Sequence, residues 1–168
     1  AAAAILGPTD EESRGVRQVK LGADGRFAGD LWIEGLGSAF PNIVSPDQLV
    51  EGKQWPRMEG AKVFKHAITK MPAAVRTVLE AEGVSPADLK LLVPHQANLR
   101  ISEAVQKSLG LRDDQVFNNI QKYGNTTAAS IPLALHEALD EGRLQRGDLV
   151  AFTAFGAGFT WGAALLRW

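Results

Sequence analysis

From residue 58 to the C-terminus, short apolar runs alternate with stretches of helical periodicity, and this alternation constrains the fold more than any other feature of the sequence. Apolar residues three and four positions apart mark helices, whereas short apolar runs bounded by Gly or Pro mark buried strands. The predicted strands cover 91–93, 149–155 and 159–168, and the predicted helices cover 58–83, 98–109 and 126–139. Strands that alternate with helices and finish in a hairpin indicate an α/β layered sheet with helices on its faces.

The first 57 residues are less regular. Residues 1–7 are predicted to form a short buried strand, and residues 15–21 and 31–33 are predicted to form two more. Residues 34–57 are rich in Gly, Pro, Asn and Ser, which predicts a long loop, and loops of that length are usually functional or mobile. The chain has no initiator Met and begins inside a predicted strand, which suggests a fragment, a processed chain or an incomplete piece.

Three smaller features complete the expected secondary structure. Pro72 lies inside the first helical stripe and is expected to kink that helix or to split it in two. Ser85-Pro86 predicts a short helix with a serine N-cap, and Val116-Phe117 predicts a brief strand.

Composition excludes several classes of function. The chain has no Cys, which excludes a disulfide scaffold, a thiolate zinc site and a cysteine nucleophile within these residues. Its net charge of -1 gives no basic field that would hold nucleic acid or an anionic membrane. The apolar runs are too short to span a bilayer, and the N-terminus lacks the charged region of a secretory signal. We therefore expect a cytoplasmic protein with no metal site, no cofactor, no nucleic-acid partner and no membrane partner.

Three segments of polar or small residues lie at predicted strand ends, where α/β sheets bind ligands. His95 follows a buried strand and precedes a helix, whose N-terminus favours a neutral imidazole that can donate a hydrogen bond. Asn125 precedes the third helix, and its amide could donate to a substrate carbonyl. Ala157 lies in a turn with Gly156 and Gly158, where backbone N–H groups can approach a ligand as an oxyanion hole requires.

Each segment also has a structural explanation. His95 could be a histidine held in the structure by its own hydrogen bonds. Asn125 could serve as a helix cap, and the glycines could serve a hairpin turn. The residues alone leave both explanations open and name no reaction.

Taken together and in order, these segments closely resemble the C-terminal half of the ketoacyl synthase III family, the 3-oxoacyl-acyl-carrier-protein synthases of the thiolase-like superfamily. The resemblance is carried by the stretches 58–65, 93–101, 124–132 and 155–162. It implies the C-terminal half of a thiolase-like fold, a mixed five-stranded sheet with helices on its faces. It also implies that residues 1–57 hold the end of the N-terminal half, connecting strands and the long loop, and that residues 58–168 form the C-terminal domain.

The resemblance further implies a reaction and a role for each group. In this family a cysteine accepts an acyl group from acyl-CoA, malonyl-acyl-carrier protein loses CO2, and the carbanion attacks the acyl-enzyme, which initiates fatty acid synthesis. Carried over, His95 and Asn125 hydrogen-bond the malonyl thioester carbonyl, and the Ala157 N–H forms half of the oxyanion hole. Many relatives have Gly where Ala157 stands, but a backbone donor does not depend on that side chain. The cysteine would come from the N-terminal half, so this chain alone is expected to be inactive.

Substrate and partner positions follow from the same resemblance. The positions that match the CoA channel or border the acyl pocket are Met58, Gly60, Phe64, Ala97, Asn98, Ile101 and Phe155. Lys65 and Arg100 match basic positions proposed to meet the acidic acyl carrier protein, and a solvated helix face would explain both equally well. The implied partners are the cysteine-bearing N-terminal half, acyl carrier protein and a second copy of the full enzyme in a homodimer.

Two alternatives stand beside condensation: a non-catalytic binding module that kept the fold, and an acyltransferase of the same fold that acts on oxygen or nitrogen. The absent cysteine favours the binding module. The intact set of His95, Asn125 and the Gly-rich turn favours carbon–carbon condensation. The choice of acyl-CoA is not specified by the sequence.

Overall fold

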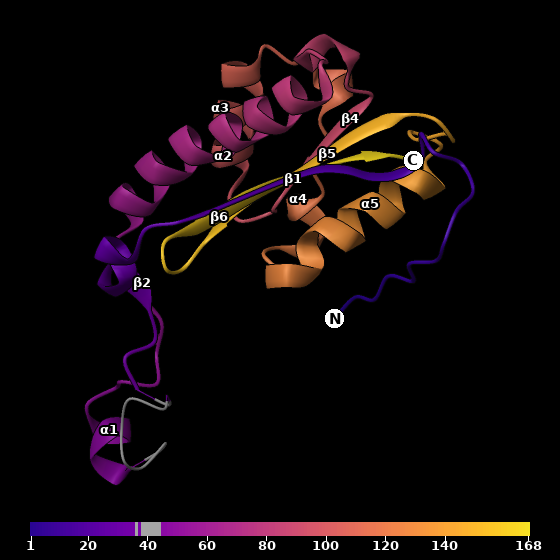
Figure 1. Ribbon diagram of the computed structural model, residues 1–168. Coiled ribbons are helices and arrows are strands. Elements are labelled where there is room, and N and C mark those ends of the chain that lie inside the picture. The colour runs from indigo at the N-terminus through magenta and orange to yellow at the C-terminus, as the bar shows by residue number, and fades with distance from the viewer. Residues whose placement is uncertain (36, 38–44) are drawn as a thin grey trace.

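The computed structural model describes residues 1–35, 37 and 45–168. One sheet contains the strands in the order β1-β6-β5-β4, with the bounds Gly15–Ala23, Thr160–Arg167, Leu149–Gly156 and Leu91–Pro94 (Figure 1). β6 pairs antiparallel with both β1 and β5, whereas β4 pairs parallel with β5. Val116 adds an isolated parallel bridge to Leu92 on the outer edge of β4, where a fifth strand was expected. The predicted α/β fold class is confirmed.

Helices cover the two faces of this sheet. α2 (Gly60–Glu82) and α3 (Leu99–Leu109) lie on one face, and α5 (Ser130–Asp140) lies on the other (Figure 1). The larger core joins α2 and α3 to the sheet through fully buried side chains such as Val75, Val105 and Leu165. A smaller core holds α5 against β4 and β5. Burial of these apolar stripes is the main favourable contribution to the fold.

α2 is one continuous helix although Pro72 lies inside it. Pro72 removes one backbone hydrogen bond, but Met71, Val75 and Val78 around it are buried against the sheet. Packing of an amphipathic face supplies most helical stability in proteins, and here it offsets the missing bond. The predicted split of this helix is therefore wrong.

The predicted buried strand at residues 1–7 is also wrong. These residues have no assigned secondary structure, and all of them are exposed. An apolar run becomes a strand only where a neighbouring strand accepts its backbone hydrogen bonds. Residues 1–7 pair with no strand of the described sheet, in which β1 is the edge strand and pairs with β6 alone.

The predicted loop at 34–57 contains regular structure, and its residues 36 and 38–44 lie outside the described residues. α1 (Pro46–Val50) begins with a capping box made by Ser45 and Gln48. β3 (Arg57–Met58) pairs with β2 (Leu31–Trp32), and this small unit lies away from the four-stranded sheet (Figure 1). α4 (Ile120–Tyr123) was likewise not predicted. Short 3-10 helices are η1 (Gly25–Asp30), η2 (Pro86–Asp88), η3 (Asp113–Gln115) and η4 (Thr127–Ala129).

The face of the sheet that carries α5 is only partly covered. α5 packs on the β4 and β5 side, through contacts with Val93 and Val150. Toward β1 the same face is apolar but open, because Val19 is 58% exposed and Leu21 is 75% exposed. These two side chains stand opposite Ala164 and Gly162 of β6, which add little bulk. Within the described part of the chain, no helix combines the length and apolar character needed to cross a bilayer.

We predict that the isolated chain self-associates through this open face, because contiguous exposed apolar surface favours association. Leu21→Ser should lower the self-association measured by sedimentation velocity. Leu99→Ser is the matched control, since Leu99 is 41% exposed at the start of α3 and should leave association unchanged. A monodisperse monomer of the unmodified chain that melts cooperatively would contradict this prediction.

Candidate active site

The backbone of His95 continues the parallel ladder between β4 and β5. Its N–H donates to the Thr153 carbonyl at 2.8 Å, directly after the last paired residue of β4. The imidazole therefore stands at the carboxyl end of a buried strand, as predicted. The ring is half-buried, and this burial lowers the pKa of His95 below its usual value. A neutral ring at neutral pH follows from this burial.

Gln96 fixes the loop that carries His95. Its side chain is 3% exposed and donates to the carbonyl of Pro94 at 2.7 Å and, more weakly, to that of Phe117 at 3.4 Å. Its Oε1 accepts the backbone N–H groups of Asn119 and Ile120 at 3.0 and 3.2 Å. The amide thus joins the loop after β4 to the segment that leads into α4. Four such bonds to a buried side chain hold the loop in one position.

Asn125 stabilises the turn that leads into η4 and α5, because its Oδ1 accepts the Thr127 N–H at 2.9 Å. The helix-cap role considered from the sequence is not what the structure shows, since the N-cap residues of η4 and α5 are Thr126 and Ala129 and neither helix has a side-chain cap bond. The Asn125 side chain is exposed, and its Nδ2 has no acceptor among the described residues, which leaves both N–H donors of this amide available. Thr127 has a φ of 53°, which is rare and costly for a β-branched residue. Backbone strain of this kind gathers at functional sites.

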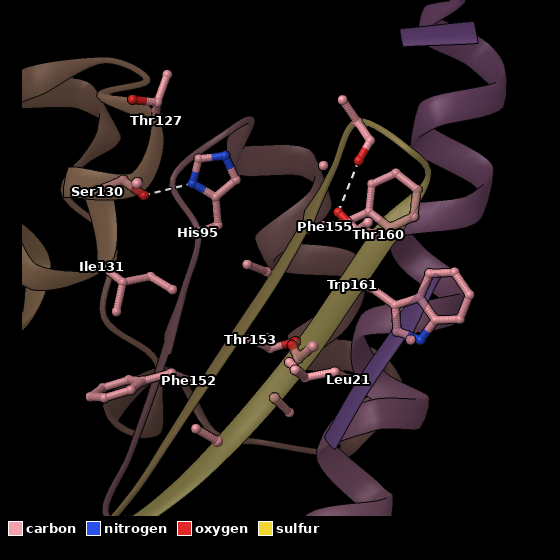
Figure 2. A pocket seen from close by; sticks show the side chains of 18 of the residues that line it. Leu21, His95, Thr127, Ser130, Ile131, Phe152, Thr153, Phe155, Thr160 and Trp161 are labelled. Carbon is pink, nitrogen blue, oxygen red and sulfur yellow. Dashed lines mark hydrogen bonds between the residues drawn. The ribbon is translucent and has the colours of Figure 1, made fainter. Parts of the chain in front are cut away.

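The turn after β5 carries Ala157. The Ala157 carbonyl accepts the Thr160 hydroxyl at 2.9 Å (Figure 2). Gly158 has a φ of 133°, and a Cβ there would lie 2.8 Å from the Thr160 side chain, so this position requires glycine. Phe159 is fully buried, and its backbone N–H and carbonyl pair with Asp24 at 2.9 and 2.8 Å. The Gly158-Phe159 peptide bond is cis. These contacts hold the backbone of the turn in place.

One cavity of about 1060 Å³ brings these groups together, since His95, Asn125, Phe155 and Ala157 all border it. Its apolar walls come from β1, β5 and β6 and include Val19, Leu21, Phe152, Ala154, Gly162 and Ala164. In Figure 2 the His95 ring stands between the start of α5 and the strands that carry Phe155 and Trp161. A hydrogen-bond donor set at the rim of an apolar cavity suits a substrate with a reactive carbonyl and an apolar chain.

The positions expected to line a CoA channel lie outside this cavity lining. Gly60 is exposed at the start of α2, and Met58 is 62% exposed in β3. Asn98 is exposed and caps α3 by accepting the Arg100 N–H at 3.0 Å. Ala97 is half-buried, whereas Ile101 is 7% exposed and belongs to the main core.

The basic positions lie where α2 and α3 begin. Lys65 is exposed on α2. The Arg100 guanidinium lies 5.4 Å from the ring centroid of Phe64, which places one predicted carrier-protein residue over one predicted CoA-channel residue. Lys62 pairs with Asp30 at 2.7 Å. In the described residues, no group of three or more His, Asp or Glu side chains is arranged to hold a metal ion.

Ser130 is a site residue that the sequence did not predict. This residue begins α5, is 2% exposed, and places its Oγ 2.6 Å from Nδ1 of His95 (Figure 2). The signal in the sequence was a third hydroxyl after Thr126 and Thr127 in the segment that follows Asn125. Sequence alone could not tell which of the three hydroxyls reaches the imidazole.

A family model described as "3-Oxoacyl-[acyl-carrier-protein (ACP)] synthase III C terminal" matches residues 79–168. Among curated relatives, the Beta-ketoacyl-[acyl-carrier-protein] synthase III of Desulfotalea psychrophila is 48% identical over 168 residues, which is 100% of this chain and 51% of the relative. That of Roseiflexus castenholzii is 45% identical over 168 residues, 100% of this chain and 50% of the relative. The chain thus spans about half the length of the curated relatives that it matches.

Solved structures give the same picture. The 3-oxoacyl-[acyl-carrier-protein] synthase III of Aquifex aeolicus superposes with a TM-score of 0.82 and 41% identity, over 95% of this chain and 46% of that one. The synthase III of Thermus thermophilus superposes with a TM-score of 0.83 and 44% identity, over 94% of this chain and 47% of that one.

The lowered pKa of His95 predicts how stability changes with pH. The folded state favours the neutral ring, so between the folded pKa and the unfolded value of about 6.5 the unfolded chain binds more protons. The free energy of unfolding should therefore be insensitive to His95 above about pH 6.5 and fall as the pH drops below it. Chemical denaturation of the unmodified protein and of His95→Gln across this range measures the effect. As the pH falls below about 6.5, the unmodified protein should lose more free energy of unfolding than His95→Gln does. If the free energies of unfolding of the two proteins changed in parallel with pH, His95 would not have a lowered pKa in the folded state.

Proposed function

The chain belongs to the family of 3-oxoacyl-[acyl-carrier-protein] synthase III C-terminal domains, and from this premise we propose that it supplies the enolate-stabilising groups of a decarboxylating condensing enzyme. The substrates in this proposal are an acyl-CoA and malonyl-acyl-carrier protein, and no cofactor takes part. The nucleophilic cysteine comes from the remainder of the enzyme, because this chain contains none. Residues 58–168 carry the reacting groups, whereas within residues 1–57 strand β1 completes the same sheet and forms part of the cavity wall.

The proposed reaction has two stages. In the first, the cysteine thiolate of the remainder attacks the acyl-CoA thioester and displaces CoA. In the second, the bond from the malonyl group to its carboxylate breaks, CO2 leaves, and the electron pair forms an enolate of the thioester. The enolate carbon then attacks the acyl-cysteine carbonyl, and expulsion of the thiolate gives the 3-oxoacyl-acyl-carrier protein.

His95 and Asn125 act in the second stage. Each offers one N–H to the thioester oxygen on which the enolate charge appears, and donors held in place there lower the barrier to decarboxylation. The Ala157 N–H donates instead to the oxyanion formed when the enolate attacks. The observation that supports these roles is that one cavity is bordered by His95, Asn125 and Ala157. A neutral His95 suits this role, since a neutral imidazole can donate without being an acid.

The remainder of the enzyme is proposed to cover the open face of the sheet. Val19 and Leu21 are exposed on that face and also line the cavity that holds His95. A partner that buries these side chains would close the cavity and bring its own groups beside the donors. Water would be excluded from the site, which strengthens every electrostatic contact inside it.

The approach of the acyl carrier protein is proposed along the starts of α2 and α3. Lys65 and Arg100 are cations on exposed helix positions there, and the carrier protein is acidic. The guanidinium of Arg100 lies over the ring of Phe64. The pantetheine arm is proposed to run along the positions Gly60, Phe64, Ala97, Asn98 and Ile101. Met58 and Phe155 are proposed to border the acyl pocket. The cytoplasmic location and the homodimer expected from the sequence stay predictions.

We predict that His95→Ala and Asn125→Ala in the complete enzyme each slow malonyl decarboxylation by about 10²–10³, since each removes one donor from the developing enolate. Acyl transfer from acyl-CoA to the cysteine should be much less affected, because a thiolate can be stabilised by a helix N-terminus without a histidine base. Release of labelled CO2 and labelling of the protein by radioactive acetyl-CoA measure the two half-reactions separately.

A suitable control is His136→Ala, which removes an exposed histidine on α5 that pairs with Asp140 and lies away from the cavity lining. It should leave both half-reactions unchanged. Loss of acetyl labelling in His95→Ala with decarboxylation intact would reverse the assignment and make His95 a general base for the cysteine.

A further inference from the structure

Ser130 makes two contacts with the loop that carries His95. Its Oγ lies 2.6 Å from Nδ1 of His95, and the backbone N–H of Gln96 donates to the same oxygen at 3.2 Å. The side chain is 2% exposed, so water has almost no access to this group. Figure 2 shows the ring of His95 with Nδ1 toward Ser130 and the other ring nitrogen directed away from it.

The proton count of these contacts favours one tautomer of His95. A hydroxyl has one proton to donate and can accept two hydrogen bonds. If Ser130 donates to Nδ1, then Oγ accepts from Gln96, every group is paired, and the imidazole proton resides on Nε2. If Nδ1 carries the proton instead, Oγ accepts twice and its own proton needs another acceptor. Among the described residues Ser130 Oγ has no further partner, so the second arrangement leaves a buried donor unpaired.

We propose that Ser130 is a positioning residue that holds neutral His95 in the Nε2–H tautomer. The consequence for chemistry rests on the proposed function: an Nε2–H donates to the enolate oxygen, whereas an Nε2 lone pair would repel it. Burial of the ring supports the proposal because it keeps the imidazole neutral, the state in which the tautomer matters.

The segment from Asn125 to Ser130 supplies one proposed donor, Asn125, and the residue that positions the other, His95. Asn125 holds the Thr127 N–H and so fixes the turn into η4 and α5, and Ser130 is the first residue of α5. A change in this turn would move the Asn125 amide and the Ser130 hydroxyl together. Asn125, one proposed donor, and Ser130, which positions the other donor His95, are therefore linked by the six-residue segment from Asn125 to Ser130.

The test uses the complete enzyme and three variants. Ser130→Ala removes the hydroxyl, and Ser130→Thr keeps it. Ser102→Ala is the matched control, because Ser102 is also buried, at 4% exposed, but donates to Asn118 Oδ1 at 2.6 Å and does not touch His95. Nitrogen-15 NMR of histidine-labelled enzyme reads the tautomer, with the His95 signals identified by their loss in His95→Gln.

The unmodified enzyme, Ser130→Thr and Ser102→Ala should show a proton on Nε2 and a bare Nδ1 for His95, and Ser130→Ala should show a mixture. Decarboxylation by Ser130→Ala should fall by roughly 10–100-fold, less than for complete loss of a donor, because part of the population keeps the correct tautomer. Acyl transfer to the cysteine should be unchanged, and Ser130→Thr should restore decarboxylation.

A proton on Nδ1 in the unmodified enzyme would overturn the proposal without any variant. So would a Ser130→Ala enzyme that keeps both the Nε2–H signature and full decarboxylation. An enzyme that shows the predicted tautomers but has no decarboxylase activity would support the role of Ser130 and reject the proposed function, so the two failures are distinguishable.

Discussion

The parallel pairing of β4 with β5 is the constraint on which the site depends. It ends with the Thr153 carbonyl accepting the His95 N–H at 2.8 Å, which places the imidazole beside β5. β5 then runs on to Gly156 and the turn that carries Ala157. This one ladder therefore sets how far the His95 ring lies from the backbone of Ala157. Two side chains outside the sheet support this arrangement. Gln96 hydrogen-bonds the segment that leads into α4 and so holds the loop after β4. Ser130 contacts Nδ1 of His95 and so holds the imidazole ring.

The sequence predicted the long, periodic elements because the spacing of their apolar residues indicates which face is buried. The period of the apolar residues, together with the flanking Gly or Pro residues, correctly located β1, β4, β5 and α3. The short helices α1 and α4, of 5 and 4 residues, have no stripe to detect and depend on local capping and on contacts distant in sequence. At residues 1–7 the sequence predicted a strand that the structure does not contain, because an apolar run cannot form a strand without a neighbouring strand.

The candidate site was predictable to the extent that its residues follow strand ends. His95, Asn125 and Ala157 were all selected by that rule, and the resemblance to a family added a role for each. The contact between Ser130 and His95 joins residues 35 positions apart, and no local pattern encodes it. The open apolar face was likewise invisible in the sequence. Val19 and Leu21 alternate as a half-buried strand should, and only the sheet order shows that their face lacks a helix.

The central claim is that this chain holds the donors for enolate formation and none of the nucleophile. The most direct measurement is incubation of the purified chain with radioactive acetyl-CoA and malonyl-acyl-carrier protein, alone and after addition of the cysteine-bearing remainder. We expect no labelled protein and no 3-oxoacyl product from the chain alone, with both restored by the remainder and the label found on its cysteine. Appreciable product formation by the chain alone would mean that the chain carries a nucleophile of its own.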